Sequence, residues 1–187
     1  MRNLSSQNLI TLILFHIIRL LPNYVTLALI KKRAFILQVG YNKIYFTLDF
    51  LKNYTNTQLS YLSDICAIDY PKRISRFEVV YNIISVPYNS TFRIKSCIHE
   101  LISLNSISLL FISANWFERE IWDLFGIYFF EHYRLRRILT DYGFFGYPLR
   151  KDFPVSGFLE VRYNEETQKV TYEPFQVTCS GRFLNSR

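Results

Sequence analysis

The sequence predicts an α+β protein: a small mixed β-sheet domain with packed helices, followed by a long extended C-terminal tail. Short β-branched and aromatic runs bounded by turn residues recur between residues 24 and 98, as strands do. One amphipathic segment at 115–126 has the apolar spacing of a helix, and glycine and proline interrupt the chain beyond it. We therefore expect an N-terminal apolar helix at 1–22, the sheet domain at 23–126, and a basic elbow with an extended partner-binding tail at 127–187.

The N-terminal segment Asn3–Leu21 is predicted to be a helix that ends at Pro22. Its apolar run is about ten residues long, which is roughly half of what a membrane-spanning helix requires. His16 and Arg19 also interrupt the apolar pattern. We expect this helix to pack on the domain or on a neighbouring protein, and a helix lying on a membrane surface is the alternative.

Most of the next segments are predicted to be strands. The candidates are Tyr24–Ile30, Phe35–Val39, Lys43–Thr47, Ile65–Ile68, Phe77–Val86 and Phe92–Ile98. The charged run at 31–33 separates the first two strands, and Gly40 marks a turn after the second. Leu48–Leu62 has a mixed pattern that favours a helix, and a short helix is expected near Ile107–Ile112.

The strongest helix signal lies between Asn115 and Phe125. Four apolar side chains fall on one face and are expected to be buried: Phe117, Ile121, Leu124 and Phe125. Asn115 followed by Glu118 matches a variant of the capping box, and Gly126 is the expected C-terminal cap. We expect Trp116, Phe117, Ile121 and Phe125 to anchor the helix.

The charges of this helix allow two interpretations. Arg119 and Asp123 are four residues apart and can pair along the helix surface. The two glutamates Glu118 and Glu120, with the later His132, could form an acid–base set of an independent enzyme. No histidine or nucleophile lies inside the helix itself, so the pattern favours surface or interface charges.

A basic elbow and a tail follow the helix. Three arginines in four positions (134, 136 and 137) predict a docking surface for anions or acidic side chains. Gly143, Gly146 and Pro148 indicate loop or extended chain. A polar turn at 164–167 and a strand candidate at Lys169–Tyr172 interrupt the tail. The tail cannot bury a core of its own, so it is either disordered or ordered on a partner.

Composition excludes several classes of function. The net charge of +7 is dispersed along the chain, whereas a nucleic-acid-binding protein would more often concentrate it on one face. The cysteines (Cys66, Cys97 and Cys179) are isolated, and no Cys-x-x-Cys motif supports zinc or iron–sulfur ligation. A stand-alone basic protein that binds RNA or a membrane surface is one interpretation that this charge leaves open.

The region around the helix resembles a known family. The runs Glu118–Gly126, Leu135–Phe144 and Gly146–Pro154 closely resemble the thirty-kilodalton subunit of respiratory complex I, and the resemblance extends upstream through Asp64–Pro71 and Arg76–Tyr81. The sequence departs from the family pattern at three positions, where it has Tyr133, Phe145 and Tyr147. Two titratable positions of the family are lost at 145 and 147, which favours a packing or docking role.

The resemblance implies a non-catalytic core subunit in the hydrophilic arm of mitochondrial NADH:ubiquinone oxidoreductase. It implies that this chain binds no cofactor, while FMN and iron–sulfur clusters lie in neighbouring subunits. The expected partners are other complex I subunits, chiefly the large quinone-site subunit and the iron–sulfur subunits, with no nucleic acid and only indirect membrane contact. The expected location is the matrix side of the inner membrane.

Thirteen residues of the resembling runs are expected to form interfaces with these subunits, several of them through inter-subunit salt bridges. They are Glu118, Arg119, Glu120, Trp122, Asp123, His132, Arg136, Arg137, Asp141, Tyr142, Arg150, Lys151 and Asp152.

Overall fold

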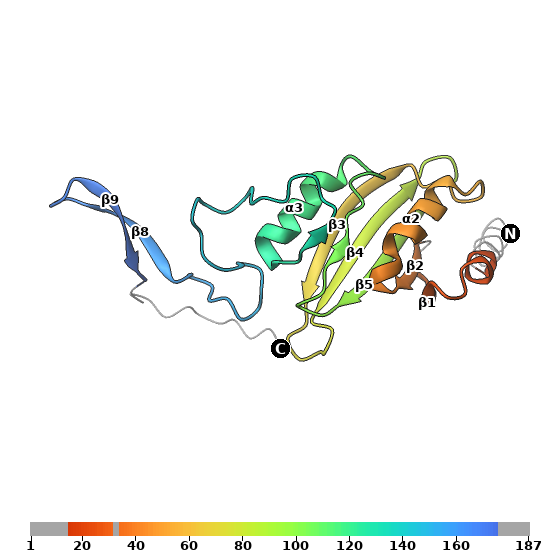
Figure 1. The fold of residues 1–187 in the computed structure, drawn as a ribbon, viewed down its shortest axis with the longest axis horizontal. Helices are drawn as coiled ribbons and strands as arrows, with labels where there is room; N and C mark the ends of the chain where they lie inside the picture. The colour runs from red at the N-terminus through yellow and green to blue at the C-terminus, as the bar shows by residue number, and fades with distance from the viewer. Residues whose placement is uncertain (1–14, 32–33, 176–187) are drawn as a thin grey trace, which may run out of the picture.

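A five-stranded sheet with helices on one face forms the main body of the protein (Figure 1). The computed structural model describes residues 15–31 and 34–175. The strands are β1 (Val25–Lys31), β2 (Ala34–Val39), β3 (Tyr61–Asp69), β4 (Phe77–Ser85) and β5 (Ser90–Ile98). Their order in the sheet is β1-β2-β5-β4-β3. The β2–β5 pair is parallel and the other pairs are antiparallel, so the prediction of a mixed sheet in an α+β domain is confirmed.

Two helices cover the same face of this sheet, α2 (Ile44–Asn53) and α3 (Ala114–Phe125) (Figure 1). Alternate residues of each strand point toward them because successive side chains of a strand face opposite sides. Phe77, Tyr81 and Ile83 of β4 are thus fully buried in one core with Leu48 of α2 and Ile121 of α3. The core therefore fixes the position of α3 relative to the sheet.

The strand predicted at Lys43–Thr47 is wrong. The chain forms a short 3-10 turn, η1 (Tyr41–Lys43), and then enters α2. Ile44, Leu48 and Leu51 have helical spacing and are completely buried against the sheet. Packing of this stripe overrides the strand propensity of the aromatic and β-branched residues at its start. The helix predicted over Leu48–Leu62 ends at Asn53, and β3 begins at Tyr61.

Two further boundaries differ from the prediction. β3 covers nine residues, well beyond the predicted Ile65–Ile68, because it pairs with β4 along nearly its whole length. The helix expected near Ile107–Ile112 is a turn, in which the N–H groups of Leu110 and Phe111 both donate to the Ile107 carbonyl, each at 2.9 Å. Before this turn, β6 (Leu104–Asn105) pairs in parallel with β7 (Phe129–Phe130), which follows α3.

The helix predicted near the N-terminus is present over residues 15–20 and ends before Pro22, as predicted. Ile17 and Leu21 are buried in the core, so this part of the helix packs on the domain. The rest of the predicted helix lies outside the described residues. Within the described part of the chain, no helix is both long enough and apolar enough to cross a membrane.

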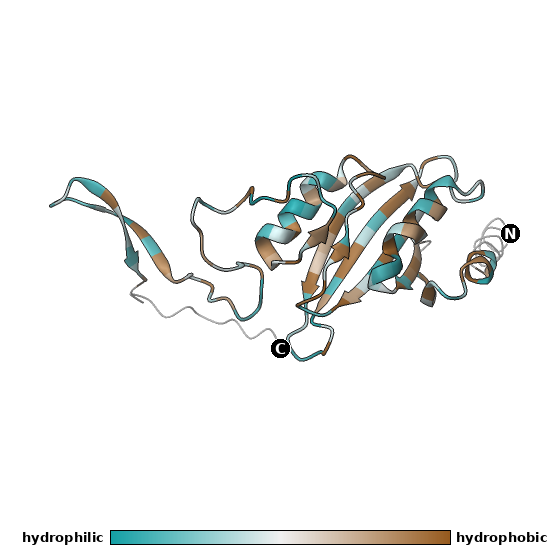
Figure 2. Cartoon of the chain, viewed as in Figure 1, coloured by the Kyte–Doolittle hydropathy of each residue, from teal (hydrophilic) through white to brown (hydrophobic). Residues whose placement is uncertain are grey.

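The tail leaves the sheet domain and forms a hairpin of β8 (Leu159–Asn164) and β9 (Lys169–Pro174), which extends away from the main body (Figure 1). The strand predicted at Lys169–Tyr172 and the turn before it are confirmed. Figure 2 shows apolar residues along both strands of this hairpin. Val161 and Val170 are more than half exposed, which gives the hairpin an apolar surface with no core of its own.

Candidate functional site

The candidate site is the region where α3, the basic elbow and the start of the tail meet. Its helix begins at Ala114, after Ser113, and no side chain caps its N-terminus. The predicted capping box of Asn115 and Glu118 is therefore wrong. The C-terminal prediction is confirmed, since Gly126 has a φ of 74° and its N–H donates to the Trp122 carbonyl at 2.9 Å.

Glu118 is buried instead of capping the helix. Its side chain accepts a hydrogen bond of 2.6 Å from the Ser106 hydroxyl and one of 2.7 Å from the Ile107 N–H. Burial raises the pKa of Glu118 to about 7, although both hydrogen bonds favour the ionised form. The carboxylate thus holds the turn after β6 against α3, and it is not a surface charge.

His132 lies next to this carboxylate. Its Nε2 atom is 3.8 Å from Glu118 Oε2, and both side chains are completely buried. Burial lowers the pKa of His132, and its Nε2 atom also lies 3.3 Å from the Asn115 carbonyl. The predicted pair is therefore brought together, but it is closed to a substrate. Glu120 does not join it: among the described residues its side chain takes part in no hydrogen bond or salt bridge.

Asp123 organises the elbow. One carboxylate oxygen accepts from three consecutive backbone N–H groups, those of Ile138, Leu139 and Thr140, at 2.7–3.1 Å. The other oxygen accepts from the Thr140 hydroxyl at 2.6 Å, and Arg137 lies 3.6 Å away. Burial of Asp123 opposes its ionisation, but these hydrogen bonds outweigh burial and lower its pKa. A single buried side chain of α3 therefore sets the path of the elbow.

The predicted pairing of Arg119 with Asp123 is wrong because Asp123 is occupied by the elbow. Arg119 instead donates from Nε to the Arg136 carbonyl at 3.3 Å, and its guanidinium lies 5.2 Å from the centre of the Trp116 ring. Trp116 itself is 62% exposed, so it does not anchor the helix as predicted. Ile121 and Phe125 are buried and do anchor it, while Phe117 and Leu124 are partly buried against the core.

An ion-pair cluster ties the start of the tail to the sheet. Arg76, the residue immediately before β4, donates to both oxygens of Asp69 at 2.8 and 3.0 Å and to Asp152 at 2.8 Å. Arg150 pairs with Glu100, and the Lys151 N–H donates to Asp69 at 2.9 Å. The hydrogen bond from Arg76 is the main reason why the pKa of Asp69 is lowered.

This cluster shows how two of the predicted interface residues are held within the chain. Arg150 and Asp152 form intrachain salt bridges, and their predicted role at an interface stays a prediction. Arg76 was not selected from the sequence as a site residue because 76 residues separate it from Asp152. Only its place in a run that resembles the family could have indicated it.

Aromatic packing closes the junction between helix and tail. Trp122 contacts the rings of Tyr128 and Tyr147 edge-on, with centroid distances of 5.9 and 6.1 Å. The guanidinium of Arg150 lies 4.5 Å from the centre of the Tyr147 ring and donates from Nε to the Phe125 carbonyl at 2.6 Å. Tyr147, a departure from the family pattern, is therefore a packing residue.

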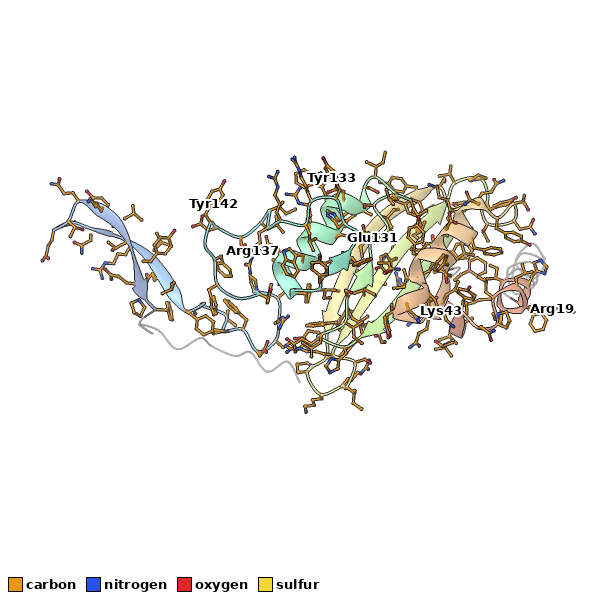
Figure 3. All side chains as sticks on the ribbon, viewed as in Figure 1. Arg19, Lys43, Glu131, Tyr133, Arg137 and Tyr142 are labelled. Carbon is orange, nitrogen blue, oxygen red and sulfur yellow. The ribbon has the colours of Figure 1, made fainter. Side chains whose placement is uncertain are left out.

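The outer surface of the elbow carries the remaining predicted residues. Arg136, Asp141 and Tyr142 are exposed, and Tyr142 is completely so. In Figure 3 the side chains of Tyr133 and Tyr142 point away from the ribbon, whereas Arg137 lies closer to it. The arrangement presents basic and aromatic side chains on a backbone that buried carboxylates hold in place.

Comparison with known proteins identifies the family. The family described as "Respiratory-chain NADH dehydrogenase, 30 Kd subunit" matches residues 37–159, which include α3, the elbow and the ion-pair cluster. The chain belongs to this family. It is therefore a subunit of the respiratory-chain NADH:ubiquinone oxidoreductase complex, as the resemblance implied.

Similar proteins come from several eukaryotes. NADH-ubiquinone oxidoreductase subunit 9 of Reclinomonas americana is 47% identical over 169 residues, which cover 90% of this chain and 83% of that protein. The mitochondrial NADH dehydrogenase [ubiquinone] iron-sulfur protein 3 of Candida albicans is 49% identical over 167 residues, or 89% of this chain and 60% of that protein.

Among solved structures, a chain of the membrane-bound sulfane sulfur reductase, an archaeal respiratory membrane complex, superposes with a TM-score of 0.64. It is 26% identical, and the superposition covers 76% of this chain and 84% of that one. The same fold therefore occurs in a second kind of respiratory assembly.

The name "iron-sulfur protein" of some relatives raises the question of a cluster in this chain. Four cysteine thiolates usually hold such a cluster. This sequence has three cysteines, and Cys66 and Cys97 lie on different strands of the sheet. Within the described residues no group of three or more His, Cys, Asp or Glu side chains is placed to hold a metal ion. The residues that the structure describes therefore do not fit an iron–sulfur cluster.

Proposed function

We propose that this subunit is a scaffold with no catalytic residues or cofactors of its own. It holds neighbouring subunits of the hydrophilic, matrix-facing arm so that electron transfer from NADH to ubiquinone, coupled to proton translocation, keeps its geometry. The partners proposed are chiefly the large quinone-site subunit and the iron–sulfur subunits. The chain is peripheral to the inner mitochondrial membrane and reaches it only through these partners.

One observation carries the proposal: the buried charges of the site are used to shape an exposed surface. Asp123 fixes the elbow, Arg76 fixes the start of the tail, and Glu118 fixes the turn after β6. An enzyme active site needs its acid and base within reach of a substrate. Here the acid–base pair is enclosed, while Arg136 and the apolar hairpin face outward.

The exposed surface has the composition of an interface. Arginine and aromatic side chains are enriched where proteins bind one another, and large exposed apolar patches mark such places. Tyr133 is 81% exposed and Phe145 83% exposed. The relatives named as subunits of NADH dehydrogenase, and the structural neighbour in a respiratory complex, support assembly as the context of this surface.

The test is assembly of the complex with an Arg136→Ala subunit. Arg136 is exposed, so its loss leaves the fold intact but removes a cation from the proposed interface. We expect several-fold less assembled complex on native electrophoresis, with unchanged apparent affinity for ubiquinone in the complex that does form. Arg73→Ala is the control, because it removes an exposed arginine from the loop between β3 and β4. Normal assembly with lost turnover would contradict the scaffold role.

A further inference from the structure

A cavity of about 1020 Å³ opens between the end of the elbow and the β8–β9 hairpin. Its walls are mainly apolar, and aromatic rings come from Tyr142, Phe144, Phe145, Phe153, Phe158 and Tyr172. Asp141 is the one charged residue of the lining in the part of the chain that the structure describes. An apolar cavity with one carboxylate on its wall is therefore placed at the exposed end of the proposed interface.

The backbone builds this cavity in advance of any partner. Gly146 has a φ of 102°, and a Cβ atom there would lie 2.7 Å from the Phe153 ring, so only glycine lets this ring approach. The Phe153 ring in turn lies 5.9 Å from that of Phe144 and 5.2 Å from that of Phe158. The Phe175 N–H donates to the Phe158 carbonyl at 3.0 Å, which closes the base of the hairpin beside the cavity.

The carboxylate is also held in place. The Tyr172 hydroxyl donates to Asp141 Oδ2 at 3.2 Å, and the Tyr142 N–H donates to Oδ1 at 2.8 Å. The contact with Tyr172 joins the elbow to the hairpin across the cavity. Within the described residues no lysine, arginine or histidine forms a salt bridge with Asp141. The negative charge of Asp141 is thus fixed next to aromatic rings, and no described residue supplies a cation to pair with it.

Outside the cavity, several arginine side chains lie over aromatic rings. Arg137 and Arg150 both lie over the Tyr147 ring, and Arg119 lies over Trp116. None of the rings lining the cavity has a described lysine or arginine over it. The faces of aromatic rings are negative, and they attract cations most strongly when water is excluded. The cavity therefore presents negative faces and a carboxylate within a protein whose net charge is +7.

We propose that this cavity receives an apolar segment of a neighbouring subunit that carries one lysine or arginine. The cation lies against the aromatic rings and pairs with Asp141, while the apolar part of the segment covers Phe145 and Val155, which are 83% and 100% exposed. An acidic segment would meet the fixed carboxylate and be repelled, and a neutral segment would leave that charge desolvated and unpaired. This inference rests on the proposed function and adds the chemistry of the partner.

The test uses the assembled complex with a photo-crosslinking phenylalanine derivative in place of Phe145. After irradiation, mass spectrometry identifies the peptide joined to position 145. We expect a peptide of another subunit that contains a lysine or arginine beside apolar residues. A peptide without a basic residue, an adduct within the chain itself, or a small molecule in the cavity would each overturn the inference, as would the absence of any adduct in a complex that contains the chain.

Charge variants supply the second measurement. Asp141→Asn keeps the hydrogen-bond acceptor and removes the charge, and we expect it to reduce the adduct yield by roughly tenfold. Asp141→Lys reverses the charge and should reduce assembled complex further, whereas Glu160→Lys, the same reversal on exposed β8, should not. An unchanged adduct with Asp141→Asn would overturn the inference. Failure of the unaltered chain to enter the complex would instead refute the proposed function.

Discussion

At the scale of single residues, burial of the Glu118 carboxyl makes the stability of the chain depend on pH. Glu118 has its pKa raised from 4.5 to about 7, chiefly by burial. An acid with a raised pKa binds its proton more tightly in the folded chain than in the unfolded one. Its contribution to stability is therefore fully present below pH 4.5 and is lost as the pH rises toward 7. His132 acts in the opposite direction, because its lowered pKa favours folding as the pH rises through its unfolded value.

We expect Glu118→Gln to flatten this pH dependence, since glutamine stays neutral. Between pH 4.5 and 7 the unaltered chain should lose about 2–3 kcal/mol of unfolding free energy relative to the variant. Urea unfolding of both chains at a series of pH values measures the difference, and the His132 contribution largely cancels in it. A constant difference across this range would show that folding does not raise the pKa of Glu118.

At the scale of elements, the end of α3 is constrained both by backbone conformation and by packing. Gly126 has a φ of 74°, and a Cβ atom there would lie 2.6 Å from the Tyr147 ring and 2.8 Å from the Arg150 guanidinium. An alanine at position 126 would be strained in the left-handed conformation, and its Cβ atom would clash with the aromatic junction. The helix and the following chain are therefore tightly packed around Gly126.

Gly126→Ala should lower the free energy of unfolding by about 2–4 kcal/mol, as measured in urea. Gly157→Ala is the matched control, because Gly157 has a similar φ of 72° with open space around it. The control should show only the conformational cost of about 1 kcal/mol. Equal effects of the two substitutions would mean that packing against Tyr147 contributes nothing.

At the scale of the whole molecule, the Arg76 cluster decides where the tail leaves the sheet domain. Its guanidinium joins Asp69 on β3 to Asp152 in the tail, and the Lys151 N–H donates to the same Asp69. The hairpin beyond these contacts has no core, so its direction depends on them and on the hydrogen bond from Tyr172 to Asp141. A scaffold needs this direction to be set before its partners bind, because ordering the tail on binding would weaken the assembly.

Arg76→Ala should release the start of the tail while leaving the sheet intact. Hydrogen exchange of the Lys151 amide should become at least tenfold faster, because its acceptor Asp69 loses the guanidinium that holds it. The amides of β4 and β5 should keep their protection. Arg162→Ala removes an arginine whose side chain is 71% exposed in the hairpin. It should change neither the exchange rate of the Lys151 amide nor the protection of β4 and β5. Unchanged protection of Lys151 would show that the tail is held elsewhere.

Local patterns accounted for much of the fold. The strands β2, β4, β5 and β9, the helix α3 and its glycine cap follow from residue spacing, which acts within a few neighbours of the chain. The first residues of α2 were predicted as a strand because they have strand propensity. In the fold, burial of Ile44 and Leu48 on one helical face outweighs that propensity. That competition is decided by contact with the sheet, which spacing within one segment cannot reveal.

The sequence indicated several residues of the candidate site, but it did not indicate which groups they bind within the chain. The sequence indicated Glu118, Asp123 and Arg150 as important, yet all three were expected to face other subunits or helix neighbours. In the structure their partners are Ile107, the Leu139 backbone and Glu100, which are 11, 16 and 50 residues away. Hydrogen-bond partners at such separations depend on how the elements pack.

The sequence alone therefore determined the family and the α+β class, since both depend on the order and type of residues. Only the tertiary structure decided which charges are buried inside the chain and which face outward. The physical reason is that the desolvation of a carboxylate, and the donors that compensate for it, exist only once distant segments are in contact. In this chain that distinction separates the residues that shape the proposed interface, such as Asp123, from exposed residues, such as Arg136, that we propose bind a partner.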